Sequence, residues 1–331
     1  MNPPAFSKAF LAPKYWPAWL LIGLFWLMAR LPWAVQRRLG AGLGWLSWQL
    51  LGQRRDDTLV NLALCFPELD DDAREQMGRD TFRHAGIGIF ETANAWFRSP
   101  EYYRDRISFE GLEHLRAAEA RGKGILLLGA HYSLLDLGAA MASLHFKVDT
   151  VYRPQPNPVF EFVMTRRRLR YHHWTIPYRD MRLLIKALKA GHTVWYTPDQ
   201  DFGRKHSVFA PFFGVSAATI TTPPRLAQVN DATVLLIHFC RDKNEERYRF
   251  LITPPLDNYP TGDDITDAAR INKELETLIR RSPAQYMWSH RRFKTQPVGQ
   301  LPPYPPKRHA AERRQRRRAA RAAARAAGKK S

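Results

Sequence analysis

The chain has 331 residues and a formal net charge of +20 at pH 7. Its hydrophobic content of 45% suits a folded protein with a large core, and its two cysteines, Cys65 and Cys240, exclude a disulfide framework and a cysteine-rich zinc site. The lack of a disulfide framework and the lack of a cysteine-rich zinc site both favour a reducing cytoplasmic location. The basic excess predicts acidic partners, namely phosphate groups, anionic lipid, nucleic acid or an acidic protein.

The first predicted element is an apolar helix, because fifteen uncharged residues separate Lys14 from Arg30. Such a helix reaches ~22 Å, short of the ~30 Å hydrocarbon core, and its continuation to Gln36 would be long enough to cross it. Its tryptophans are typical of the membrane interface. We therefore predict a membrane anchor over residues 1–38, either a short transmembrane helix or an interfacial helix; a buried core helix is the alternative. The arginines that follow it predict a cytoplasmic location for the rest of the chain.

The remaining sequence predicts one α/β domain over residues 39–300. An apolar stretch, 39–51, extends the predicted membrane-facing surface. Beyond it, periodicity and turn residues predict helices and then an alternation of strands and helices. The predicted helices are 54–66, 71–97, 112–121, 134–144, 158–171, 181–190, 217–229 and 264–281, and the predicted strands are 124–129, 148–153, 193–197, 233–240 and 247–253, the last two antiparallel. The expected fold class is therefore α/β, with a central mixed, largely parallel sheet flanked by helices and preceded by the membrane-anchoring helix. Residues 301–331 form a Pro-rich and then Arg/Ala-rich basic tail.

The principal candidate for chemistry, His131, lies where a buried strand between Gly124 and Gly129 leads into the helix 134–144. Residues five apart on a straight helix point about 140° apart, so His131 and Asp136 can meet only if His131 precedes the helix and Asp136 lies in its first turns. Asp136 would then accept a hydrogen bond from one ring nitrogen and leave the other as a base. The alternative is an ordinary turn histidine, followed by an aspartate that the helix dipole favours.

Charged residues also cluster after later predicted strands. Arg166 and Arg170 share a helix face, whereas Arg168 points to a different side and can reach inward. The alternative for this cluster is a solvated basic face. Asp199 and Asp201 lie in a stretch rich in turn residues, where they can bind sugar hydroxyls, position an arginine or cap a turn.

Several classes of protein lack support in the sequence. No Gly-x-Ser-x-Gly elbow or Gly-x4-Gly-Lys-Ser/Thr loop is present, which excludes the common serine hydrolases and P-loop enzymes. His172 and His173 lack nearby acids and are interpreted as surface or structural histidines. Nothing resembles a base-reading module, so we predict no specific nucleic-acid partner. We also predict no metal site and no cofactor.

Several motifs, in order, carry a family resemblance. His131-Tyr-Ser-Leu-Leu-Asp136 resembles the HX4D/E motif of the glycerolipid acyltransferase superfamily. One branch is similar at further positions: Tyr152-Arg153-Pro154 with Asn157, Thr165-Arg-x-Arg168-x-Arg170, Pro198-Asp-Gln-Asp-x-Gly203, Ala210-Pro-Phe-Phe-Gly214 and Tyr286-Met-Trp-x-His-Arg-Arg-Phe-Lys294. This branch is the late acyltransferases of lipid A synthesis, the lauroyl and myristoyl transferases of Gram-negative bacteria. The resemblance ends near Pro297, and the usual acid of this branch is Glu where the chain has Asp136.

The resemblance implies transfer of a fatty acyl group from acyl carrier protein to a hydroxyl of a lipid A precursor, giving an acyloxyacyl unit at the cytoplasmic face of the bacterial inner membrane. It implies that His131 is the general base and that Asp136 orients it. Arg168 is then the group that stabilises the thioester oxyanion or a substrate phosphate. The predicted substrate-binding residues are Arg166, Arg170, Asp199, Asp201 and Arg153.

Three further interpretations stay open at this point. The apolar loop 208–214 is either an acyl-chain wall or part of the core. The acceptor is either a lipid A precursor or a lysophospholipid or aminolipid. In a different class, the chain is a membrane-tethered polyanion-binding protein whose basic tail is the functional part.

Overall fold

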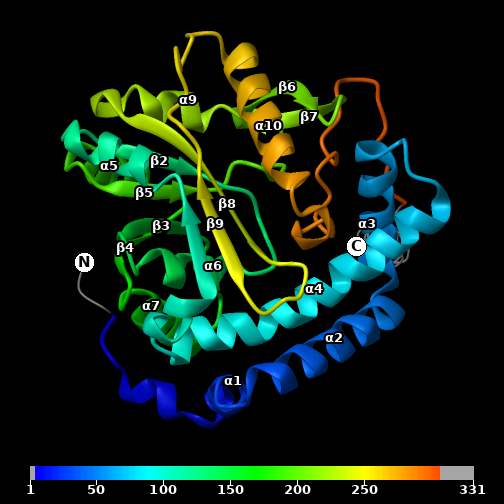
Figure 1. Cartoon of the computed structure of the whole chain (residues 1–331), viewed down its shortest axis with the longest axis vertical. Helices are drawn as coiled ribbons and strands as arrows, with labels where there is room; N and C mark the ends of the chain where they lie inside the picture. Colours follow the sequence, from blue (N-terminus) through cyan, green and yellow to red (C-terminus); the bar gives the residue numbers. More distant parts are fainter. Residues whose placement is uncertain (1–3, 306–331) are drawn as a thin grey trace, which may run out of the picture.

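The computed structural model describes residues 4–305, in which helices surround a mixed, mostly parallel sheet (Figure 1). The helices are Trp16–Met28 (α1), Trp33–Leu50 (α2), Gly52–Cys65 (α3), Asp71–Phe97 (α4), Leu112–Ala120 (α5), Leu135–Ala142 (α6), Pro158–Arg168 (α7), Met181–Lys189 (α8), Thr222–Ala227 (α9) and Asp264–Ile279 (α10). The strands are Ile107–Glu110 (β1), Ile125–Leu128 (β2), Val148–Tyr152 (β3), His172–Pro177 (β4), Thr193–Tyr196 (β5), Ser207–Phe212 (β6), Val215–Ile220 (β7), Thr233–Arg241 (β8) and Tyr248–Ile252 (β9).

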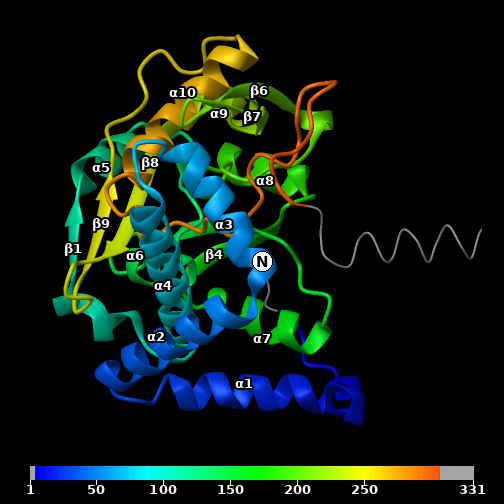
Figure 2. The same ribbon diagram turned by 90° about the vertical axis from the view of Figure 1, so that its right-hand side faces the viewer.

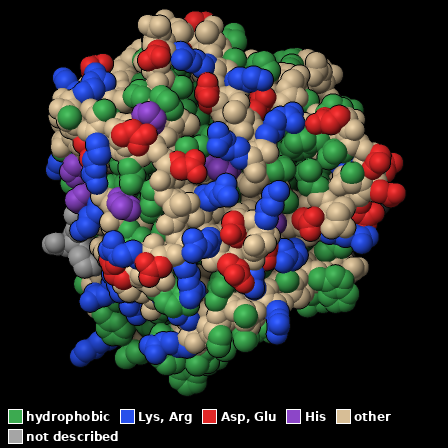
Figure 3. Space-filling view, in the orientation of Figure 1, with side chains coloured by type: hydrophobic (Ala, Val, Ile, Leu, Met, Phe, Trp, Pro, Cys, Tyr) green, Lys and Arg blue, Asp and Glu red, His purple; other side chains and the backbone are tan. Residues whose placement is uncertain are grey.

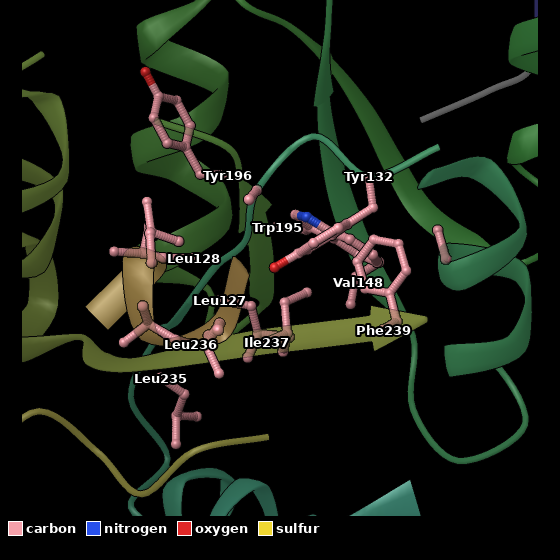
Figure 4. Close-up of a cluster of buried hydrophobic side chains, with 14 of the residues drawn as sticks. Leu127, Leu128, Tyr132, Val148, Trp195, Tyr196, Leu235, Leu236, Ile237 and Phe239 are labelled. Atoms are coloured by element: carbon pink, nitrogen blue, oxygen red, sulfur yellow. The ribbon is translucent and has the colours of Figure 1, made fainter. Parts of the chain in front are cut away.

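The main sheet has the strand order β1-β9-β8-β2-β5-β3-β4, and only the pair β8–β9 is antiparallel. The predicted fold class is confirmed for the α/β architecture and for the largely parallel sheet. Strands β2 and β5 are buried along their whole length because both faces of this part of the sheet are covered, which explains their continuous apolar sequences. Side chains from β2, β5 and β8 meet in the core (Figure 4).

The long helix α4 connects the N-terminal helices to the sheet. Asp70 caps it by accepting the N–H of Ala73, and two acidic residues favour its first turn. Gly40 and Gly44 of α2 face Gly86 of α4, where a β-carbon would collide with the partner helix's backbone. These glycines allow α2 to lie close along α4, while α4 also packs against α6 (Figures 1 and 2).

The N-terminal apolar segment forms two helices and not one continuous helix, and the membrane anchor over residues 1–38 stays a prediction. Helix α1 ends at Met28, and Pro32 precedes α2, so the chain turns before Gln36, the residue to which a spanning helix would have to continue. Among residues 4–305, no helix has both the length and the apolar character that a bilayer crossing requires. Apolar side chains are exposed on both helices and gather at the lower edge of Figure 3, over α1 and α2; they include Leu20, Leu24, Leu27, Leu39, Trp45 and Leu50.

Two segments between residues 207 and 229 also differ from expectation. The predicted loop 208–214 is mainly strand β6, and Phe212 and Phe213 are buried in the core. The predicted helix 217–229 begins instead as strand β7, and its helical part is only α9. The physical reason lies in a hairpin: Phe213 and Gly214 have positive φ angles, which reverse the chain and pair β6 with β7.

Two edge strands, β1 and β4, were not predicted. Strand β1 has only four residues and alternates between partly buried and exposed positions. Strand β4 begins at His172, which is buried, as expected for a structural histidine. The division into 1–38, 39–300 and 301–331 stays a prediction, and most of the basic tail, 306–331, lies outside the described residues.

Candidate active site

The carboxyl ends of β2 and β5 bring His131 and Asp199 together. These strands are parallel neighbours, with Leu128 paired to Tyr196. His131 lies three residues beyond Leu128, and Asp199 lies three residues beyond Tyr196. The two side chains therefore leave adjacent strands at the same level, at the sheet edge where open α/β sheets bind ligands.

Asp199 holds His131 through two hydrogen bonds. The backbone N–H of His131 donates to Oδ2 at 2.9 Å, and ring Nδ1 donates to Oδ1 at 2.6 Å. Because the carboxylate accepts at Nδ1, the lone pair of the neutral ring is on Nε2. Nε2 lies 3.4 Å from the Thr197 hydroxyl. The Asp199 side chain is fully buried, whereas 21% of the His131 side chain is exposed.

The charges of this pair stabilise each other. Burial alone would lower the pKa of His131, but the charge and hydrogen bond of Asp199 raise the pKa above its ordinary value of 6.5. Burial alone would raise the pKa of Asp199, but the charge of His131 and its hydrogen bonds lower the pKa below the ordinary value of 3.8. Asp199 is therefore ionised at neutral pH and increases the basicity of the imidazole.

The expected contact between His131 and Asp136 is not formed, and this is the main correction at the site. Asp136 is the second residue of α6, and its Oδ1 accepts from Arg168 Nε at 2.9 Å and Nη2 at 2.6 Å. Nδ1 of His131 is already occupied by Asp199, which approaches from another strand. Local spacing alone therefore gave the wrong partner for the histidine.

Arg168 does reach inward, as predicted. Its side chain is 13% exposed, and its Cζ lies 5.9 Å from the ring of Tyr152, the last residue of β3. Burial would lower the pKa of Arg168, but Asp136 and nearby tyrosines keep it above its ordinary value. The Arg168–Asp136 pair thus provides a fixed cation at the same strand ends as His131.

The other predicted site residues fall into two groups. Arg153, Arg166 and Arg170 are exposed. Asp201 is buried, and its carboxylate accepts from the backbone N–H groups of Gly203 and Thr295 and from the Thr295 hydroxyl. These bonds give Asp201 a structural task, anchoring the segment after the last helix.

The same C-terminal segment contacts the His131 turn through its backbone and adds the side chain of His290. Met287 N–H donates to the carbonyl of His131 at 2.9 Å, and Tyr132 forms a bridge with Tyr286. His290 Nε2 accepts the N–H of Asp201, and burial and nearby cations lower the pKa of His290 to about 4. The motif 286–294 indicated this segment, but its position against the His131 turn depends on the fold.

Within residues 4–305, no cluster of three or more His, Cys, Asp or Glu side chains could hold a metal ion. The site offers a base with a buried carboxylate and, at the same sheet edge, a cation with its own carboxylate. This combination can remove a proton from an alcohol and stabilise developing negative charge.

Comparison with known proteins gives a consistent result. Residues 3–295 match the family described as bacterial lipid A biosynthesis acyltransferase. The chain is 40% identical to the lipid A biosynthesis lauroyltransferase of Escherichia coli K12, covering 90% of this chain and 98% of that protein. It is 39% identical to the palmitoleoyltransferase of the same strain, covering 89% and 96%, and 32% identical to the myristoyltransferase, covering 91% and 94%.

Proposed function

Because the chain belongs to the bacterial lipid A biosynthesis acyltransferases, we propose that it transfers a fatty acyl chain from acyl carrier protein to a hydroxyl of a lipid A precursor. The observation that carries the mechanism is the His131–Asp199 pair at the carboxyl ends of β2 and β5. A base held in one tautomer by a buried carboxylate suits the removal of a proton from an alcohol.

In the proposed reaction, Nε2 of His131 takes the proton of the acceptor hydroxyl as its oxygen attacks the thioester carbonyl. The tetrahedral intermediate then collapses, the carbon–sulfur bond breaks, and the thiol leaves with the proton from Nε2. Asp199 remains ionised and stabilises the imidazolium between these steps. No acyl-enzyme is required, because the alcohol attacks the thioester directly.

Arg168 keeps its predicted role in this proposal, as the cation that meets either the thioester oxyanion or a substrate phosphate. The part played by Asp136 changes: it holds the Arg168 side chain through its Oδ1 rather than holding His131. The loss of one donor to an oxyanion is typically worth about 3–4 kcal/mol of transition-state stabilisation.

We further propose that α1 and α2 lie in the interfacial region of the inner membrane, on its cytoplasmic face. The exposed leucines and tryptophans of the two helices form an apolar surface of the kind that contacts lipid. The basic balance of the chain would favour an acidic carrier protein and a phosphorylated acceptor, which increases the rate of encounter.

The test is an incubation of the purified chain with acyl carrier protein thioesters of several lengths, each with a lipid A precursor or with a lysophospholipid, followed by mass spectrometry. Addition of one acyl chain to the lipid A precursor supports the proposal. Acylation of the lysophospholipid alone would overturn the acceptor.

A variant that lacks residues 303–331 addresses the basic tail separately. The proposal predicts that this variant retains acyl transfer. If neither the full chain nor this variant transfers an acyl group, and the full chain only binds polyanions, the chain is better interpreted as a membrane-tethered polyanion-binding protein.

A further inference from the structure

A buried arginine, Arg241, contacts the turn that carries His131. Arg241 is the last residue of β8, so it lies at the same sheet edge as the candidate base. Its side chain and that of Glu91 on α4 are fully buried and form an ion pair. Tyr248 also donates to Glu91, at 3.1 Å. This cation thus lies in the interior, where a charge without partners would be costly.

The guanidinium also bonds to the turn itself. Nη2 of Arg241 donates to the Ser133 hydroxyl at 2.7 Å, and the same nitrogen lies 3.1 Å from Nδ1 and 3.2 Å from the carbonyl oxygen of His84. Burial and the charges of Arg241 and Arg83 lower the pKa of His84 to about 3. His84 is therefore neutral and can accept at Nδ1, so Ser133 is one of several acceptors for the cation.

A second route connects the same two residues. The side chain of Gln285 accepts the backbone N–H of Arg241 and donates to its carbonyl, both at 2.9 Å. The Gln285 carbonyl accepts the N–H of Ser133 at 2.8 Å. On the α4 side, a β-carbon at Gly88 would lie 2.0 Å from the Ser133 carbonyl oxygen. The turn is therefore held from β8 and from the C-terminal segment, and α4 packs closely against it.

We propose that Arg241 is a positioning residue for acyl transfer, which fixes the His131 turn through the Ser133 hydroxyl while Glu91 fixes Arg241. This inference rests on the proposed role of His131 as the base. Asp199 sets the tautomer and the charge of His131, but its two oxygens bond to the backbone and the ring of His131 and not to Ser133. The bond from Arg241 two residues later restrains that turn, and with it the distance from Nε2 to the acceptor hydroxyl.

The decisive variant is Ser133→Ala in the full chain, with acyl carrier protein thioester and lipid A precursor as substrates. Arg241 keeps Glu91 and His84, so this change leaves the guanidinium with partners and should not unfold the protein. We expect kcat to fall about tenfold, because small misplacements of reacting groups cost large factors. The KM values and the pH at half-maximal kcat/KM should not change, since Asp199 still holds the base.

The matched control is Ser143→Ala, whose hydroxyl donates to the Ala140 carbonyl at the far end of α6; we expect wild-type kinetics. A second variant, Arg241→Lys, keeps a positive charge beside Glu91 but cannot also reach Ser133. It should lower kcat to a similar extent when assayed below its unfolding temperature. The double variant should be no slower than either single variant, because both remove the same contact.

An unchanged kcat in Ser133→Ala overturns the inference. If the KM values rise at the same time, Ser133 is a substrate-binding residue instead. The proposed function fails in a different way. If His131→Ala retains transfer, the base assignment is wrong, whereas an inactive His131→Ala beside a fully active Ser133→Ala refutes only the role of Arg241.

Discussion

The structure contains two histidine–aspartate pairs at opposite ends of the same strand, β5. At its carboxyl end, His131 Nδ1 lies 2.6 Å from Asp199; at its amino end, His192 Nδ1 lies 2.7 Å from Asp149. Both carboxylates are fully buried, and both rings are partly exposed. A hydrogen bond between histidine and a buried aspartate is therefore not sufficient to identify a catalytic base.

The two pairs differ in charge and surroundings. The pKa of Asp199 is lowered, whereas burial raises the pKa of Asp149 above 3.8 despite its bonds from His192 and Trp174. The ring of His192 packs on Trp174 and His173, and Asp149 accepts the N–H of Trp174. The amino-end pair thus ties β3, β4 and β5 together, while the carboxyl-end pair lies where parallel strands bind ligands.

The largest predicted effect is the difference in acyl-transfer rate between variants of the two histidines. His131→Ala should reduce acyl transfer by about 10²- to 10⁴-fold, because it removes the proposed general base. His192→Ala should leave the rate within about threefold, since only a contact between strands is lost, well below the general-base range. Initial rates with an acyl carrier protein thioester measure both, and circular dichroism checks that each variant is folded. Equal losses in the two variants would contradict the distinction between the pairs.

Substitution of the two aspartates should likewise have different effects on activity. Asp199→Asn replaces one acceptor oxygen with an NH2 group, so Nδ1 of His131 must accept and Nε2 must carry the proton. The base is then in the wrong tautomer, and we expect a loss of about 10²-fold or more in kcat. Asp149→Asn should retain most activity. A wild-type rate for Asp199→Asn would show that the carboxylate does not set the tautomer.

Asp136→Asn tests whether Asp136 holds Arg168 and not His131. The variant should lower the rate of acyl transfer by about tenfold, because Arg168 is held more weakly.

In the wild type, kcat/KM should rise with pH through a pKa above 6.5, because the base must be neutral and Asp199 raises its pKa. Asp136→Asn should leave this pH dependence unchanged. The measurement is kcat/KM across pH 5–9. If its acidic limb shifts to lower pH in Asp136→Asn, Asp136 and not Asp199 is the partner of His131.

Local sequence signals predicted much of the fold. The helix 71–97 agrees with α4 at both ends, because an acidic N-terminus and a long amphipathic pattern mark it. The antiparallel pair β8–β9 was also predicted. Strand β7 was missed because its apolar residues run on into the Pro-Pro pair at positions 223 and 224, and those prolines begin α9 rather than interrupt a longer helix.

The site was only partly accessible to the same reasoning. His131 and Asp199 were both singled out, but their contact depends on β2 and β5 being neighbours, which no local spacing reveals. Once β2 and β5 are known to be neighbours, the contact can be predicted, because His131 and Asp199 each lie three residues beyond the paired residues Leu128 and Tyr196. Arg241 gave no signal, because an arginine at the end of an apolar strand is indistinguishable from a surface residue until α4 covers it.

The smallest predicted effect concerns stability, and it has opposite signs at the two aspartates. A lowered folded-state pKa means that Asp199 stabilises the fold above pH 3.8 and that this contribution is lost as the pH falls through the folded pKa. The raised pKa of His131 contributes stability that is full below pH 6.5 and lost as the pH rises through its folded value. The carboxyl-end pair therefore contributes most between these two limits.

Asp149 has the reverse linkage, because its raised pKa means that the folded state favours the protonated carboxyl, which Asn resembles. At pH 5.5 we expect Asp199→Asn to lower the free energy of unfolding and Asp149→Asn to raise it. Partly exposed His192 can change tautomer to suit the amide, which His131 can do only by losing its function as a base. Urea unfolding at pH 5.5 measures both changes, and destabilisation by Asp149→Asn would show that ionised Asp149 supports the fold as Asp199 does.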